Sequence, residues 1–162
     1  IEAVKIMARI IERTEEVALD QIPPLKHSPS TKGGAITKAA TEVGLTVGAK
    51  FLVAFTQSGD SARRMSRLRS PIPMLALTPE IGTYNRLALS WGVESMLTAV
   101  VNHTDEMVMQ VDALLIESKR VNIGDLVLIV AGSPPGIPGS INAMRVHKIG
   151  DAVGGVAPAY RK

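Results

Sequence analysis

Short, continuous apolar runs alternate along this chain with amphipathic stretches, and this alternation restricts the possible folds more than any other feature. The runs KFLVAF, PMLALT and LVLIVA have the length of strands. They lack the polar alternation of a half-exposed strand, so each is predicted to be covered on both faces. Helix-sized segments of about 10–15 residues separate them, and that order predicts βαβ units around a parallel sheet.

Five strands and five helices are predicted. The strands are expected at 50–55, 73–78, within 92–101, 126–131 and 142–147. The helices are expected at 1–19, 31–47, 62–69, 79–91 and from Thr104 onward. The link between the last two strands is too short for a crossover helix, so this pair is predicted to be antiparallel. The result is an α/β fold with a mostly parallel sheet and an antiparallel edge strand.

Helix ends and connecting segments can also be predicted. Ser30 or Thr31 is expected to cap the second helix, and Thr104 the last one. The last helix carries acidic residues at its start, with Lys119 and Arg120 in its last turn. Three prolines in 20–30 indicate a linker. The tail 150–162 is expected to be flexible. A stripe of mostly small side chains on the second helix predicts close packing on a sheet or on another subunit: Ala35, Ile36, Ala39, Ala40 and Val43.

Composition excludes several classes of function. The 162 residues fit one domain, and an apolar fraction of 46% is enough for a core. A net charge of +3 and an aromatic fraction of 3% argue against a nucleic-acid partner. No apolar stretch is long enough to span a membrane. Cysteine is absent, which suits the reducing cytoplasm, and the three histidines are scattered singly, so no metal site is predicted: His27, His103 and His147.

The turn after the first predicted strand is the strongest candidate site. Hydroxyl and amide side chains gather there, a glycine permits close approach of the backbone, and a helix begins: Thr56, Gln57, Ser58, Gly59 and Ser61. Such a turn at the carboxyl end of a strand favours a phosphate group. Asp60 argues the other way, because a carboxylate repels an anion unless it points outward. A capped helix behind a polar turn is an equally good interpretation of the same residues.

A second candidate is the loop from Ser133 to Ser140, which is rich in proline and glycine. It follows the fourth strand and should reach the same edge of the sheet as the turn. A rigid turn into the last strand explains it as well. Arg63, Arg64, Arg67 and Arg69 form a basic helix face. Such a face is usually solvated, although the first two can lean toward an anion at the helix start.

Ser58 was considered as a nucleophile. It lies in Gln-Ser-Gly and lacks the first glycine of the Gly-x-Ser-x-Gly elbow, which argues against a serine hydrolase.

Four stretches, taken in order, resemble the C-terminal domain of bacterial pyruvate kinases. They are IEAVKIMARIIERTEE, LVAFTQSGDSARRMSRLRSPIPMLALTP, Gly124-Asp125 before LVLIVAGSPPG, and SINAMRVHKIG. The resemblance covers nearly all of residues 1–149. It implies a three-layer α/β/α domain over 31–149, with a five-stranded, mostly parallel sheet. Residues 1–19 then resemble the helix that leads in from the family's catalytic barrel.

The resemblance implies a regulatory and assembly role. Catalysis in the family belongs to a (β/α)8 barrel of about 250 residues, which this chain is too short to contain, so the chain itself is expected to be catalytically inactive. No catalytic or metal-binding residue is assigned to it, and no cofactor. The Mg and K that the full enzyme needs belong with the barrel. The resemblance also implies a homo-oligomer, with helix 31–47 and strand 142–147 as the pairing faces.

The family's effector site maps onto both candidate loops. The turn Thr56, Gln57, Ser58, Gly59 and Ser61 would hold one phosphate of a sugar phosphate or a nucleotide monophosphate. The effector loop would close over it: Ser133, Pro134, Pro135, Gly136 and Gly139. Prolines stand where members that respond to fructose 1,6-bisphosphate often have an arginine, and Asp60 replaces an often basic residue. A mono-phosphorylated effector is therefore expected. The alternative is a stand-alone α/β sensor of phosphorylated ligands.

Overall fold

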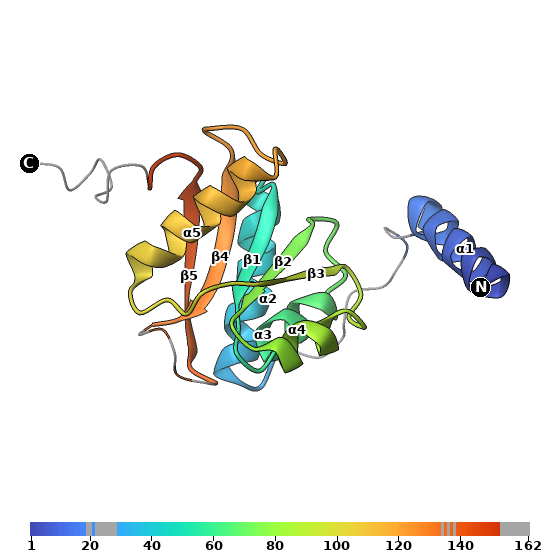
Figure 1. The fold of residues 1–162 in the computed structure, drawn as a ribbon, viewed down its shortest axis with the longest axis horizontal. Helices are drawn as coiled ribbons and strands as arrows, with labels where there is room; N and C mark the ends of the chain where they lie inside the picture. The colour runs from blue at the N-terminus through green and yellow to red at the C-terminus, as the bar shows by residue number, and fades with distance from the viewer. Residues whose placement is uncertain (19–20, 22–28, 134, 136, 138, 153–162) are drawn as a thin grey trace, which may run out of the picture.

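A five-stranded sheet in the order β3-β2-β1-β4-β5 forms the centre of the computed structural model (Figure 1). The structure describes residues 1–18, 21, 29–133, 135, 137 and 139–152. The strands are β1 (Phe51–Phe55), β2 (Met74–Thr78), β3 (Val93–Leu97), β4 (Leu126–Gly132) and β5 (Ile141–Lys148). The helices are α1 (Glu2–Ala18), α2 (Lys32–Val47), α3 (Asp60–Ser66), α4 (Ile81–Leu87) and α5 (Thr104–Glu117).

The predicted topology is confirmed. β1 pairs in parallel with both β2 and β4, and β2 pairs in parallel with β3. β4 and β5 are antiparallel, with an irregularity between Ala131 and Gly132. β1 and β2 are almost wholly buried, as their uninterrupted apolar sequence requires.

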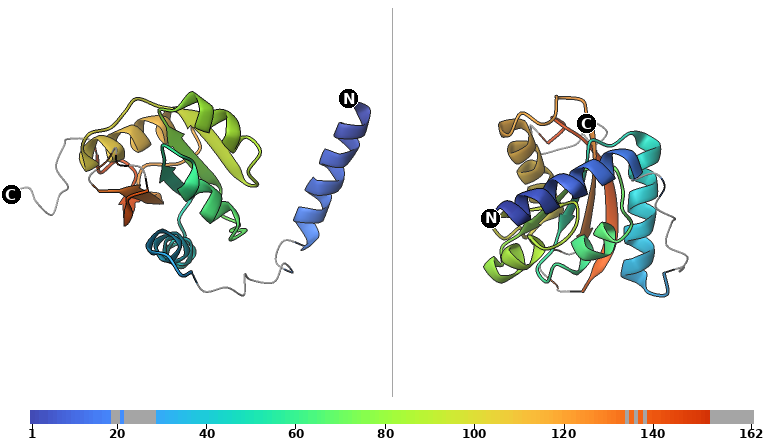
Figure 2. Two further views of the ribbon diagram at one scale, coloured as in Figure 1. Left: turned by 90° about the horizontal axis from the view of Figure 1, so that it is seen from below. Right: turned by 90° about the vertical axis from the view of Figure 1, so that its right-hand side faces the viewer.

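Two apolar clusters lie on opposite faces of the sheet, so the three-layer arrangement is also confirmed (Figure 2). The cluster beneath α2 and α3 contains many small side chains, such as Ala54 and Ala76, whereas the α5 side carries bulkier ones, such as Val53 and Leu75. Small side chains let α2 pack close to the strands. At Gly44 a Cβ atom would lie only 2.8 Å from the end of the buried Leu52 side chain.

Thr31 caps α2 as predicted, since its hydroxyl oxygen accepts a hydrogen bond from the Gly34 N–H at 3.1 Å. The predicted stripe is confirmed in part. Ala40 is buried, and Ile36 and Val43 pack against the core, whereas Ala35 is exposed and Ala39 only half-buried. Thr37, Thr41 and Gly44 complete the buried face. Threonines are tolerated there because each donates its hydroxyl proton to a backbone carbonyl one turn earlier in the helix.

Several predicted helix boundaries need correction. α3 spans Asp60–Ser66 rather than 62–69. α4 spans Ile81–Leu87 rather than 79–91. α5 ends at Glu117, and Lys119 lies beyond it in a left-handed conformation (φ 56°), so the predicted basic last turn is outside the helix. His103 rather than Thr104 is the N-cap of α5.

Glu106, in the first turn of α5, reaches back to the chain before the helix. Its carboxylate accepts the Asn102 N–H at 2.7 Å, and this hydrogen bond lowers the pKa of the Glu106 carboxyl. The acidic first turn predicted for this helix therefore includes a local contact that holds the chain at its entry.

Asp112 and His147 form a buried pair that joins α5 to β5. His147 Nε2 lies 2.7 Å from Asp112 Oδ1, and both residues are almost fully buried. The other carboxylate oxygen accepts the N–H groups of Gly150 and Ala152 at 3.0 and 3.2 Å. The stretch predicted as a flexible tail, 150–162, thus begins with residues held against α5, and the rest of it lies outside the described residues.

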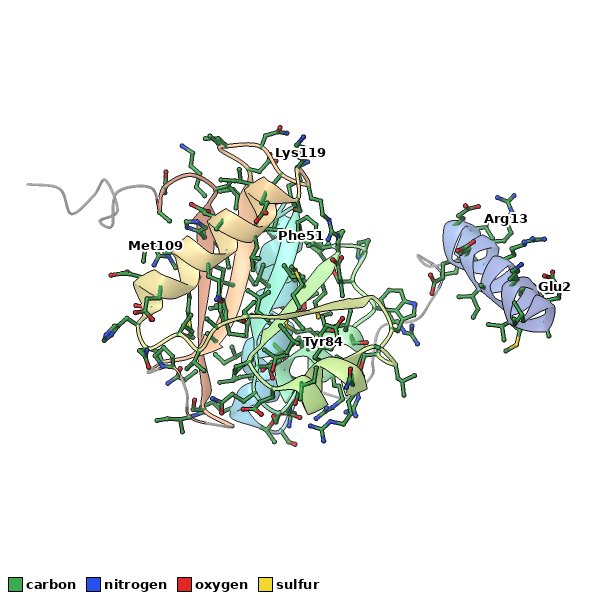
Figure 3. The ribbon with its side chains drawn as sticks, in the orientation of Figure 1. Glu2, Arg13, Phe51, Tyr84, Met109 and Lys119 are labelled. Atoms are coloured by element: carbon green, nitrogen blue, oxygen red, sulfur yellow. The ribbon has the colours of Figure 1, made fainter. Side chains whose placement is uncertain are left out.

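α1 buries none of its residues and stands apart from the sheet (Figures 1 and 2). Side chains project all round it, with Glu2 and Arg13 among them (Figure 3). Two side-chain hydrogen bonds join it to the rest of the described chain: Trp91 Nε1 donates to Glu15, and the nearby Gln21 donates to the Val17 carbonyl oxygen. The predicted linker, 20–30, lies mostly outside the described residues.

We expect Asp112→Ala to lower the free energy of unfolding by about 3 kcal/mol, because it leaves His147 and two backbone N–H groups buried without their acceptor. Urea unfolding followed by circular dichroism measures this. Glu117→Ala removes an exposed carboxylate from the same helix and should change stability by less than about 0.5 kcal/mol. Equal effects of the two substitutions would contradict the structural role of the Asp112–His147 pair.

Candidate functional site

A cavity of about 290 Å³ opens at the edge of the sheet where the parallel strands reach their carboxyl ends. Four segments from different parts of the chain form its walls. These are the first residues of α2 with its cap, the turn after β1, the segment 98–101 after β3, and the loop between β4 and β5. Open α/β sheets bind ligands at this edge.

The turn after β1 is held in shape by its own hydrogen bonds. Thr56 Oγ1 accepts the Gly59 N–H at 2.9 Å, and Thr83 Oγ1 donates to the Gln57 carbonyl oxygen at 2.6 Å. Gly59 has a φ of 82°, a left-handed conformation that disfavours other residues. A Cβ atom there would also lie 2.8 Å from Arg63 Nη1. The turn is therefore preformed around a glycine, as the sequence predicted.

Ser61 lines the cavity, although the residue as a whole is only 3% exposed. Among the described residues the buried side-chain atom without a hydrogen-bond partner is Gln110 Oε1, so the Ser61 hydroxyl is not a buried unsatisfied group. Thr56, Gln57 and Ser58 line the cavity as well. The structure thus brings together four of the predicted turn residues, with Gly59 shaping the turn behind them.

The loop between β4 and β5 contributes only part of its predicted set. Pro135 and Gly139 line the cavity, whereas Pro134 and Gly136 lie outside the described residues. Ser133 faces a separate small cavity beside α5. Its N–H and carbonyl bond to the side chain of Asn142 at 2.7 and 2.6 Å, which closes the base of the loop. The described contacts of Ser133 are therefore structural.

Two walls of the cavity were missed by reasoning from the sequence. One is the start of α2, at Thr31–Gly33, and the other is the segment 98–101. Both follow from topology. β3 is parallel to β1, so the chain that leaves it emerges at the same edge. α2 runs back toward the start of β1, so its first residues lie at the carboxyl edge. Applying these two rules would have found both walls.

Comparison with known proteins assigns the chain to a family. The family model "Pyruvate kinase, alpha/beta domain" matches residues 34–147. A pyruvate kinase of Mycobacterium tuberculosis is 48% identical over 149 residues, which cover 92% of this chain and 31% of that protein. The pyruvate kinase of Corynebacterium glutamicum is 41% identical, covering 91% and 31%. The solved structure of Cryptosporidium parvum pyruvate kinase in complex with ADP superposes with a TM-score of 0.68 at 26% identity, covering 76% and 25%.

This chain belongs to the pyruvate kinase alpha/beta domain family. The resemblance predicted from its motifs is therefore confirmed. The chain spans about a third of the length of the curated relatives that it matches.

The charges of this pyruvate kinase domain are unevenly placed around the cavity. Lys32, Asp60 and Arg64 line it. Arg64 Nε donates to Asp60 Oδ2 at 2.6 Å. Of the other arginines on the predicted basic face, Arg69 stacks on Trp91 at 4.4 Å and Arg63 donates to the Ser58 carbonyl. Arg64 is the member of that face that lines the cavity.

The opposite side of the cavity is largely apolar. It is lined by side chains from β1, β2, the segment after β3, α5 and the last loop: Phe55, Leu77, Val100, Val101, Met107 and Ile137. The cavity therefore has one end with hydroxyls, N–H groups and cations, and another suited to an uncharged surface.

The described residues bring together no group of three or more His, Cys, Asp or Glu side chains that could hold a metal ion. Among the same residues, no helix combines the length and the apolar content that crossing a bilayer requires.

We expect Gly59→Ala to lower the free energy of unfolding by about 1–2 kcal/mol, because alanine is strained at a left-handed φ and its methyl group would displace Arg63. Gly82→Ala is the matched control. A Cβ atom at Gly82 meets nothing within 4 Å and lies in a helix, so this change should stabilise the domain by about 0.5 kcal/mol. Thermal unfolding distinguishes the expected loss of stability in Gly59→Ala from the expected gain in Gly82→Ala. A neutral Gly59→Ala would mean that the turn relaxes freely.

Proposed function

We propose that this chain is the effector-binding and subunit-pairing domain of a pyruvate kinase, the phosphotransferase that makes pyruvate and ATP from phosphoenolpyruvate and ADP. The observation that carries the effector site is the convergence of Thr56, Ser58 and Ser61 with Arg64 at one end of the cavity. Hydroxyl and guanidinium donors gathered at one place suit the oxygens of a phosphate group. The compartment we infer is the cytoplasm, where glycolysis takes place.

The effector we propose carries a single phosphate. Its phosphate lies at the polar end of the cavity, near the turn Thr56–Ser61, where Lys32 and Arg64 supply positive charge. A second phosphate would meet the apolar wall. No lysine or arginine occurs in residues 132–141, so the last loop has none to offer it. Burying an unpaired anion there is strongly unfavourable.

The proposed binding is expected to be weak to moderate in this chain. Charge-assisted hydrogen bonds contribute about 1.5–3 kcal/mol each, and two or three of them, less the entropic cost of association, give a dissociation constant between about 1 μM and 1 mM. Calorimetric titration with AMP, glucose 6-phosphate and fructose 1,6-bisphosphate should show binding of at least one monophosphate.

Ser58→Asp and Ser61→Asp should abolish that binding, because each places a carboxylate beside the phosphate. Ser58 is exposed and accepts the longer side chain without a steric penalty, which keeps the test valid if the buried Ser61 variant folds poorly. Ser118→Asp, an exposed site at the far end of α5, is the matched control and should bind as the parent does. Equal binding by all four proteins would place the ligand elsewhere, and binding of the bisphosphate alone would contradict the single-phosphate proposal.

Subunit pairing is proposed through β5 and α2. β5 pairs with β4 on one side and is the edge of the sheet (Figure 1). Because side chains alternate along a strand and His147 faces α5, Met144 and Val146 face the α2 side, where they are 41% and 43% exposed. Leu45 of α2 is 49% exposed. An open edge beside exposed apolar side chains suits a two-fold contact.

We expect the chain to sediment as a dimer at micromolar concentration. Val146→Lys should shift it to monomer by placing two like charges near the two-fold axis. Leu89→Lys, at a site 93% exposed near α4, is the control and should leave the dimer intact. A monomer at every concentration up to about 1 mM would show that these faces do not pair by themselves.

The catalytic barrel of the parent enzyme is the third proposed partner. α1 exposes an apolar stripe that nothing in the described chain covers: Val4, Ile6, Met7, Ile10, Ile11 and Val17. An exposed stripe of this kind is typical of a helix that packs on another surface. The Mg and K of the full enzyme form no part of the function proposed for this chain.

A further inference from the structure

We infer that Arg64 and Lys32 bind the effector's phosphate, and that the Asp60 carboxylate is paired with Arg64 until the phosphate binds. This inference rests on the proposed effector-binding function. It adds a pair of cationic ligands and a competing carboxylate to the hydroxyl turn.

Arg64 bridges α3 and the start of α2. Its Nε bonds to Asp60 within α3, while its Nη1 donates to Thr31 Oγ1 at 3.3 Å, across 33 residues of sequence. The guanidinium lies beside Gly33 and Gly34, where added Cβ atoms would be at van der Waals distance, 3.9 Å from Nε and 3.6 Å from Nη1. Arginine carries five N–H donors, and no partner of Nη2 is found among the described residues. The guanidinium therefore lines the cavity with N–H donors that no described residue uses.

Lys32 stands where a helix normally prefers the opposite charge. It is the first residue of α2, and the first turn of that helix contains no acidic residue. A cation at a helix N-terminus opposes the helix dipole, so this placement is unfavourable unless an anion lies nearby. Lys32 lines the cavity and makes no ion pair within the described part of the chain. A phosphate between Lys32 and Arg64 would neutralise both the side chain and the helix end.

Asp60 is placed to compete for Arg64. The two side chains are 47% and 34% exposed, so their ion pair is screened by water and easily exchanged. A phosphate monoester carries more than one negative charge near neutral pH and accepts two parallel N–H bonds from a guanidinium. It should therefore displace the carboxylate. Ser61 also lines the cavity and offers a hydroxyl donor to the same phosphate.

The test uses the 162-residue chain and the same calorimetric titrations with AMP and glucose 6-phosphate. Arg64→Gln should weaken binding of the monophosphate by about tenfold or more, and Lys32→Gln by about threefold. Arg67→Gln removes the same charge from an exposed position of the same segment that does not line the cavity, and should change binding by less than twofold. Arg64→Lys keeps the positive charge but cannot donate two parallel hydrogen bonds. Its affinity for the monophosphate should lie between those of the parent and of Arg64→Gln.

Asp60→Asn should tighten binding by about two- to fivefold, because it frees Arg64. In the Arg64→Gln background the same change should have a smaller effect, since the competition has been removed. Thermal unfolding of each variant shows that it is folded. Equal gains in both backgrounds would overturn the competition, because Asp60 would then act by simple repulsion.

If the parent binds a monophosphate and Arg64→Gln binds it as well as Arg67→Gln does, the two cations are not ligands. The inference then fails while the proposed function stands. If the parent binds neither probe, the proposed function fails and the inference fails with it.

Discussion

The close packing of α2 against the sheet is the contact on which the rest of the structure depends. Alanines on β1 and β2, and Gly44 on the helix, let the helix backbone approach the strands, where a larger residue would meet Leu52. This contact fixes the direction of α2 and so places its first turn, with Thr31 and Lys32, beside the turn after β1. The polar end of the cavity is therefore a consequence of how the core packs.

The predictable parts of this protein are those determined by local sequence. Continuous apolar runs predicted β1, β2 and β4, and the short last link predicted that β5 runs antiparallel to β4. A glycine among hydroxyls predicted the turn Thr56–Ser61. Helix ends were less predictable, because α4 and α5 end where individual residues leave the helical conformation. Lys119, with its φ of 56°, gives no signal in the sequence.

The parts of the site that could not be predicted depend on contacts between distant segments. The role of Ser133 at the base of its loop requires Asn142 to lie opposite it. The four arginines of α3 and its continuation also differ in their contacts with distant segments. Arg69 stacks on Trp91, and Arg64 bonds to Thr31 at the start of α2. The core-facing side of α2 was predicted only in part, for a related reason. Threonine reads as polar in a sequence, but its hydroxyl is satisfied within the helix.

α2 also connects the two roles proposed for this domain. Its first turn lines the cavity, and its length packs against β5, whose free edge is the proposed pairing face. A helix moves largely as one body. Because Arg64 bonds to Thr31 at the start of α2, a ligand that moves Arg64 away from Asp60 acts on the helix that a neighbouring subunit would contact. Any coupling between the two must be reciprocal, because a subunit contact that favours one position of α2 changes the affinity for the effector by the same factor. The Arg64–Thr31 hydrogen bond is the direct side-chain link between α3 and α2 that the coupling would use.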